Sequence, residues 1–394
     1  MLKRYVIWFI LYCFMILSLT GCWDEMNIEE RNFVAGSALD LADGKKDHDI
    51  TVSFTNQFVV PSGIGSPEGG KQSDKAFTNE TTEGETLQII SHNLGTRTSR
   101  FPSYQHLKVL IFSEELAKEE NMVSKLSDMF IRDVDMRRAI KVFVSDGKAK
   151  EILNMKQDME DTPAKFIDML FERNNKDIET MDILRIGTMQ EYQLEENSYL
   201  IPRVKLENGE LHTDTAAVFY GPDDKLVGNL NARETKGYNF ATKHNNEGAV
   251  EMNVDGNPMT YKLARSNSKI KVDVDEQHLH NIDAYIHVKA EGFLGEMYGD
   301  ETVFKEDSIK KIQKEAGKSI ERLIKETIEK SQKELHADIL GVGQMIKRKH
   351  YPIWKRIHKD WENGEQYFDD VTFHVKVEAN MKDVGTSDRT KKIR

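Results

Sequence analysis

The chain has 394 residues, enough for two or three domains at the usual ~100–200 residues per domain. Acidic residues outnumber basic ones by 66 to 55, which gives a net charge of −11, whereas nucleic-acid-binding proteins normally carry a basic surface. The two cysteines, Cys13 and Cys22, are too few for a disulfide framework or a cysteine-rich zinc site. The composition therefore predicts a folded, acidic, multidomain protein without a nucleic-acid partner.

The first 22 residues have the pattern of a secretory signal. Lys3 and Arg4 precede the apolar run Tyr5–Leu19, which is shorter than the ~20 residues of a transmembrane helix. The sequence Leu19-Thr20-Gly21-Cys22 then resembles the lipobox of bacterial lipoproteins. We predict that residues 1–21 are a lipoprotein signal peptide and that Cys22 carries an S-diacylglycerol group, with its amino group a candidate for N-acylation. An uncleaved N-terminal anchor is the alternative, and it would leave an exported, membrane-tethered topology unchanged.

The residues after the signal peptide predict an N-terminal α/β domain over 22–200. Two β-rich runs, 33–41 and 50–60, precede residues 61–85, whose Gly, Ser, Thr and Pro content predicts a long mobile loop. Helices and strands then alternate, as in a sheet with helices packed on it. The expected helices are 86–95, 114–130, 147–155 and 162–172, and the expected strands are 107–112 and 139–144.

The second half of the chain predicts short strands, a long helix and a returning strand. Residues 307–336 carry apolar side chains three and four apart, the pattern of an amphipathic helix. We expect an α+β fold of several mixed α/β domains, in which this helix lies across an antiparallel-type sheet in a C-terminal domain, 201–384. An alternative divides that domain into a small β subdomain, 201–262, and a sheet-plus-helix unit, 263–384, and a polar tail, 385–394, follows. The expected strands are 200–206, 215–220, 226–230, 270–274, 285–294 and 371–377.

The common catalytic motifs HExxH, GxSxG and Walker A do not occur in the sequence. His278 and His280 lie near Asp275 and Asp283, but this spacing at the polar end of a strand is more typical of exposed loop histidines than of a metal site. We therefore predict no catalytic residue, no metal ligand and no cofactor, and we expect that the protein is not an enzyme.

One basic segment, 347–359, stands out in the acidic chain because it holds six Lys and Arg residues and no Asp or Glu. Two interpretations stay open. The segment could lie on anionic lipid headgroups or an acidic partner, since basic residues near a membrane surface contribute ~1 kcal/mol each. Its Trp and Ile side chains could instead pack on the sheet while the cations extend into water.

Four parts of the chain together follow a known pattern: Gly21-Cys22-Trp23-Asp24, Tyr104–Ala117, Ala217–Thr235, and Asp338–Gly343 with Lys355–Trp361. In this order they resemble the opening, the central segment, the start of the C-terminal region and the end of the Ger(x)C family, the C-subunit lipoproteins of bacterial spore germinant receptors. One departure is Ala38-Leu39-Asp40, where a Gly-Ile-Asp type of sequence is more usual. The loop at 61–85 also looks peculiar to this chain.

The resemblance implies a subunit that assembles with membrane-embedded A and B subunits of a nutrient germinant receptor. It places the chain at the outer face of the spore inner membrane, held through Cys22, in an assembly or docking role without enzymatic activity. The resemblance also identifies the C-terminal region as a germination-protein domain. It leaves open whether the chain binds a small-molecule germinant. The competing interpretation is a solute-binding lipoprotein of a transporter, which would need two similar α/β lobes around a cleft.

Overall fold

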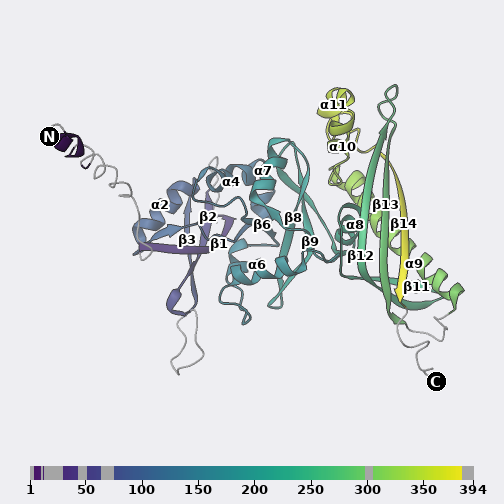
Figure 1. Cartoon of the computed structure of the whole chain (residues 1–394), viewed down its shortest axis with the longest axis horizontal. Helices are drawn as coiled ribbons and strands as arrows, with labels where there is room; N and C mark the ends of the chain where they lie inside the picture. Colours follow the sequence, from purple (N-terminus) through teal and green to yellow (C-terminus); the bar gives the residue numbers. More distant parts are fainter. Residues whose placement is uncertain are drawn as a thin grey trace, which may run out of the picture.

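The computed structural model describes residues 4–9, 12, 30–42, 51–63, 75–297 and 305–383, and within them two sheets lie side by side along the long axis of the molecule (Figure 1). The first sheet has the order β10-β9-β8-β6-β5-β1-β2-β3, with β4 on β1 and β7 on β6. The central strands β1, β5, β6 and β8 run parallel, and antiparallel strands extend the sheet on both sides. The strands are β1 (Arg31–Leu41), β2 (Val52–Val59), β3 (Phe77–Gly84), β4 (Phe101–Ser103), β5 (Val109–Ser113), β6 (Lys141–Ser145), β7 (Leu184–Arg185), β8 (Tyr199–Glu207), β9 (Glu210–Tyr220) and β10 (Lys225–Leu230).

Helices cover both faces of this sheet, because its central strands are apolar on both sides. In β5, Leu110 and Phe112 face one core, and Val109 and Ile111 face the other. The first core is closed by α2 (Leu87–Arg97), α3 (Glu114–Ala117), α4 (Met122–Arg132) and α7 (Ile186–Leu194), and the second by α5 (Ala149–Leu153) and α6 (Pro163–Asn174).

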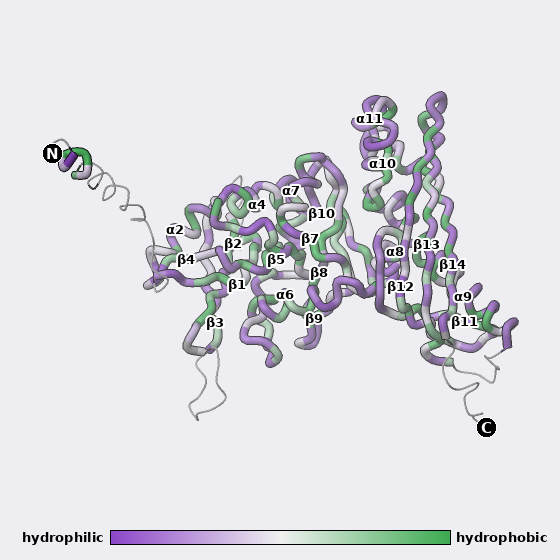
Figure 2. Tube along the Cα trace, in the orientation of Figure 1, coloured by the Kyte–Doolittle hydropathy of each residue, from purple (hydrophilic) through white to green (hydrophobic). Residues whose placement is uncertain are grey.

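The second sheet has the order β11-β12-β13-β14 and carries the expected long helix on one face. Its first three strands are antiparallel, whereas β14 pairs parallel to β13 because the chain crosses over through the helices between them. The strands β11 (Ala249–Val254), β12 (Asn257–Val274), β13 (Ile282–Met297) and β14 (Thr372–Asp383) alternate between hydrophilic and hydrophobic residues along their length (Figure 2).

The helices of the second half are α8 (Ala232–Thr242), α9 (Glu306–Lys330), α10 (Val342–Lys349) and α11 (Tyr351–Ile357). Helix α9 buries Ile312, Ala316 and Ile320 against the sheet and continues into a π-helical turn, Ser331–Leu335. Short 3-10 turns occur at Pro61–Gly63 and His358–Asp360. Within the described residues, no helix combines the length and hydropathy needed to cross a bilayer.

Several expected elements differ from the structure, and the strand expected at 270–274 is only the end of β12, which begins at Asn257. The predicted loop 61–85 contains strand β3, whose Thr81 side chain bonds that of Thr55 on β2 at 2.8 Å, and residues 64–74 lie outside the described part. The single helix expected at 114–130 is two helices, because Asn121 takes a left-handed conformation between them. Pairing with β2 and the backbone conformation of Asn121 therefore determine these elements, and the amino-acid composition of each segment alone does not predict them.

The expected domain boundary near residue 200 does not match the sheet topology. Strand β8 begins at Tyr199, and β9 and β10 extend the same sheet to Leu230. The alternative β subdomain 201–262 is likewise divided, since its last strands start the second sheet. Antiparallel pairing between β8 and β9 holds residues after 200 in the first sheet, and the second unit starts with α8.

The crossing of α8 and α9 generates a stability prediction from two helical glycines. A Cβ on Gly237 would lie 2.1 Å from the Leu323 carbonyl oxygen of α9, whereas a Cβ on Gly317 would meet its nearest atom, the Val377 carbonyl oxygen, at 3.5 Å. We expect Gly237→Ala to lower the free energy of unfolding by about 1–3 kcal/mol through overpacking. Gly317→Ala should be neutral or stabilising by up to ~1 kcal/mol, since alanine favours helix. Urea unfolding of both variants tests this, and equal effects would contradict the close crossing.

Candidate functional site

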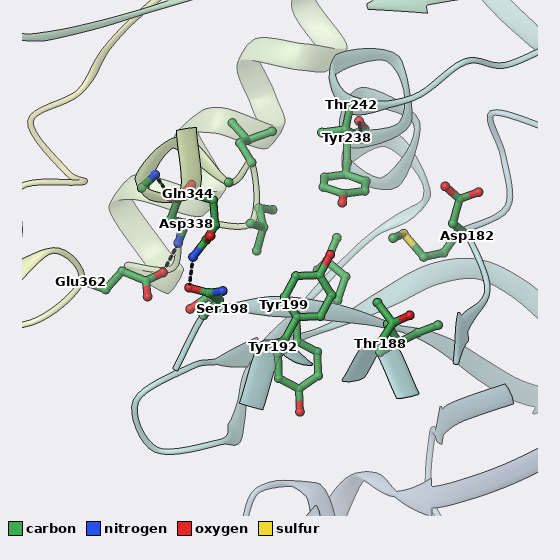
Figure 3. Close-up of a pocket in the computed structure, with 18 of the residues that line it drawn as sticks. Asp182, Thr188, Tyr192, Ser198, Tyr199, Tyr238, Thr242, Asp338, Gln344 and Glu362 are labelled. Carbon is green, nitrogen blue, oxygen red and sulfur yellow. Dashed lines mark hydrogen bonds between the residues drawn. The ribbon is translucent and has the colours of Figure 1, made fainter. Parts of the chain in front are cut away.

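A cavity of about 290 Å³ lies between the two sheets (Figure 3). One wall comes from residues 181–200, around α7 and the start of β8. The other comes from α8 and from residues 338–362, which connect α9 to β14. Interdomain cavities are a common place for functional sites. The labelled lining residues are Asp182, Thr188, Tyr192, Ser198, Tyr199, Tyr238, Thr242, Asp338, Gln344 and Glu362.

Asp338 is a buried carboxylate that caps helix α10. Its Oδ1 accepts a hydrogen bond from the Val342 amide at 3.0 Å, and its Oδ2 accepts from the Gly343 amide at 2.7 Å. The Trp361 indole donates a third bond, to Oδ2, at 3.0 Å. Burial raises the pKa of Asp338, and these donors oppose that shift. The carboxylate thus satisfies amides that a helix start leaves without intrahelical partners.

Glycine is required at position 343 because two tryptophans pack against it. A Cβ there would lie 2.6 Å from the Trp361 indole nitrogen and 2.9 Å from the Trp354 ring. The two rings meet edge to face with centroids 5.7 Å apart. Helix α10 therefore starts in a fixed position relative to the cavity wall.

Glu362 is the second buried acid and joins the two domains. Its Oε1 accepts a hydrogen bond from the Asp338 amide, and its carboxyl group also bonds the Ser198 hydroxyl of the first domain. Its backbone carbonyl accepts from the Tyr220 hydroxyl of β9 at 3.2 Å. Burial, followed by the nearby charge of Asp338, raises the pKa of Glu362 to about 8. A carboxyl group in this environment is protonated at neutral pH.

Further polar contacts cross the junction beside the cavity. Gln344 donates to the Asn197 side chain, and Lys347 forms an ion pair with Glu195 at 3.2 Å. On the other side, Lys243 of α8 pairs with Asp182 at 2.9 Å, and burial lowers the pKa of that lysine. Most charged groups around the cavity therefore already have partners. These contacts hold the two domains together. A change in the protonation of Glu362 would alter the contacts that its carboxyl group makes across the junction.

The residues singled out from the sequence lie elsewhere. Cys22 is outside the described residues. His278 and His280 are exposed and bond different carboxylates, Asp275 at 3.0 Å and Asp370 at 2.6 Å. In the described part of the chain, no group of three or more His, Cys, Asp and Glu side chains is arranged to hold a metal ion.

The basic segment 347–359 forms the end of α10 and the whole of α11. Ile353 and Ile357 are buried in the core of the second domain, and Lys347 takes part in the junction described above. Tyr351 stays exposed, with the Lys355 ammonium 5.2 Å from its ring centroid. These contacts support the interpretation in which the apolar side chains pack and the cations extend outward.

The sequence patterns described above do not mark Asp338 or Glu362 for a structural role. Asp338 stands three residues before Gly341 and the helix that follows, a pattern that could have indicated a helix cap. Glu362 gives no comparable signal, because its burial depends on residues of β8 and β9 more than 140 positions earlier in the chain.

The raised pKa of Glu362 predicts a pH-dependent stability. Its pKa is about 8 in the folded protein and near 4.5 when unfolded, so its stabilising contribution is complete below pH 4.5 and is lost as the pH rises through 8. Glu362→Gln should therefore unfold at a higher temperature than the unchanged protein at pH 9, on the order of 5 °C, with little difference at pH 5. Thermal unfolding across this range is the measurement. Glu365→Gln, at an exposed position nearby, is the control and should follow the unchanged protein. Coincident curves for Glu362→Gln and the unchanged protein would contradict the assignment.

Comparison with known proteins gives a consistent result over nearly the whole chain. Residues 24–206 match the family model described as spore germination protein N-terminal domain, and residues 214–385 match that described as spore germination B3/GerAC like, C-terminal. Spore germination protein A3 of Bacillus subtilis (strain 168) is 30% identical over 385 residues, covering 95% of this chain and 97% of the relative. Spore germination protein B3 of the same organism is 28% identical, covering 95% and 96%.

A solved structure agrees with the fold. The crystal structure of the GerBC protein aligns with a TM-score of 0.59 and 23% identity, covering 88% of this chain and 97% of that one. It has the same mixed α+β architecture. Together with the two family models, these relatives establish that the chain is a member of the Ger(x)C family of spore germination proteins.

Proposed function

We propose that this chain is a membrane-anchored lipoprotein subunit of a spore nutrient germinant receptor that acts by docking with its partners, not by catalysis. The observation that carries the proposal is Leu19-Thr20-Gly21-Cys22 at the end of an apolar leader, in a chain of a spore germination family. Two acyl chains on one residue give stable membrane attachment, whereas one chain gives only reversible binding. The protein is then held at the outer face of the spore inner membrane.

Anchoring supports assembly in a simple physical way. A protein confined to the membrane surface meets membrane-embedded A and B subunits at a much higher effective concentration than a free protein does. Surface contacts of modest affinity are then sufficient for assembly. The family relationship supports such a role, because its named members are spore germination proteins.

The alternative of a solute-binding lipoprotein is less consistent with the architecture. Such a protein needs two similar lobes, but the first sheet here has a parallel centre with helices on both faces, and the second is mainly antiparallel with one long helix. Charged groups beside the cavity between them are also paired with each other, as in the Lys243–Asp182 pair. The structure therefore favours a docking protein over a ligand-binding cleft.

The anchor is tested by Cys22→Ala in the full chain, with Cys13→Ala in the leader as the matched control. We expect Cys22→Ala to lower the amount of protein in spore membranes by more than about tenfold, because both acyl chains are lost. Nutrient-triggered germination should slow accordingly, whereas Cys13→Ala should behave like the unchanged protein. Membrane fractionation and germination assays are the measurements. A normal nutrient response from unlipidated protein would overturn the proposal.

A further inference from the structure

One stretch of the first domain has an unusual charge for this chain. Residues 86–113 contain no Asp or Glu, although the chain has 66 acidic residues, and they include Arg97, Arg100 and Lys108. Arg97 ends helix α2, and Arg100 precedes strand β4. Both arginines are exposed, and neither has an ion-pair partner among the described residues. Two uncompensated cations therefore stand together on an otherwise acidic protein.

Two large apolar side chains are exposed at the same place. Ile89 of α2 and Phe101 of β4 are each 58% exposed and line one shallow hollow. The Phe101 ring lies against Gly95 of α2, where a Cβ would be 3.4 Å from the ring. Single exposed apolar residues are common on proteins, but an apolar pair beside free arginines is the composition of a surface that contacts lipid headgroups.

The position of this surface relative to the anchor is fixed by strand pairing. Strand β4 pairs in parallel with the first residues of β1, so that Phe101 lies opposite Arg31. Eight peptide units separate Cys22 from Glu30, just before β1, and they span at most about 28 Å. A lipid on Cys22 therefore keeps the start of β1, and the surface beside it, within that distance of the bilayer. In Figure 1, α2 lies at the end of the molecule remote from the second sheet.

We propose that the α2–β4 corner, defined by Ile89, Arg97, Arg100 and Phe101, is the face of the protein that lies on an anionic lipid surface. The arginines contact lipid phosphates, and the two apolar side chains enter the headgroup region. The inference rests on the lipid anchor of the proposed function and adds to it an orientation of the protein on the membrane. Each basic residue near an anionic surface contributes ~1 kcal/mol, which is enough once the protein is tethered.

The basic segment 347–359 is the competing lipid contact, and the structure makes it the weaker candidate. Its apolar residues Ile353 and Ile357 are buried, which leaves Tyr351 as its one large apolar side chain that is exposed. Lys347 is paired with Glu195 at the domain junction. At the α2–β4 corner, two large apolar side chains are exposed, and the two arginines have no ion-pair partner among the residues that the structure describes.

The experiment uses the full lipidated chain in vesicles of phosphatidylcholine and phosphatidylglycerol. With the leader removed and Cys22 acylated, an introduced cysteine is the only free thiol, because the sequence has no other cysteines. A fluorescent label at Ser99→Cys, between the two arginines, is compared with a label at Lys271→Cys on the exposed face of β12. We expect lipids with spin-labelled headgroups to quench the label at position 99 about threefold or more relative to the label at 271.

A charge-reversed version separates the corner from the anchor. Arg97→Glu with Arg100→Glu should reduce quenching at position 99 and abolish its dependence on salt and on phosphatidylglycerol. Its unfolding temperature should not change, because both side chains are exposed. Equal quenching at 99 and 271 on vesicles that carry the protein, or quenching unchanged by the double substitution, would overturn the orientation alone. Failure of the lipidated protein to float with the vesicles would overturn the anchor and, with it, the orientation.

Discussion

The parallel pairing of β1, β5 and β6 is the constraint on which the arrangement of the first domain depends. All parallel strands of a sheet begin at the same end of the sheet and finish at the opposite end. The direction of β1 therefore determines at which end the chain leaves the strand and where the following elements pack. At the far end of β1, the buried Asp40 accepts hydrogen bonds from the Ala149 and Lys150 amides at 2.6 and 3.0 Å and caps α5. At the start of β1, strand β4 pairs in parallel with Arg31–Phe33. One strand thus positions both a helix start and the corner nearest the proposed anchor at Cys22.

A shared core, rather than a hinge, connects the two domains. Leu200, Val218 and Leu230 of the first sheet belong to the same buried cluster as the inner face of β12–β14 and helix α9. Separating the domains would expose this apolar surface at about 25 cal/mol per Å² and leave Glu362 without its contacts to Ser198 and Tyr220 across the junction. Glu362 therefore lies at an interface where a change of its protonation alters contacts between the domains.

Local patterns in the sequence were sufficient for most elements, while long-range pairing was not. The alternation in β13 and the spacing in α9 predicted those elements nearly to their ends, whereas the strand expected at 270–274 is only the last part of β12. Strand β3 was missed because FTNETTEG is polar, and it forms a strand only because β2 offers a complete hydrogen-bonding edge. The boundary expected near residue 200 lies close to the division between the two family matches, 24–206 and 214–385, but the first sheet continues to Leu230, since strands with the same alternation can join either sheet. The junction site was beyond reach because Glu362 and Ser198 are distant in sequence.

In the proposed arrangement, a lipid tether at one end and a packed junction together limit how a membrane partner can act on this protein. Because the core is continuous across the junction, a force on the second domain turns the whole molecule instead of bending it between domains. The orientation of the anchored protein is then determined by its contacts with the membrane. A tether of eight peptide units is not enough for this, because it allows many orientations. A second contact beside the tether removes most of that freedom without requiring high affinity. The free cations and exposed apolar side chains beside β1 have the position that such a contact needs.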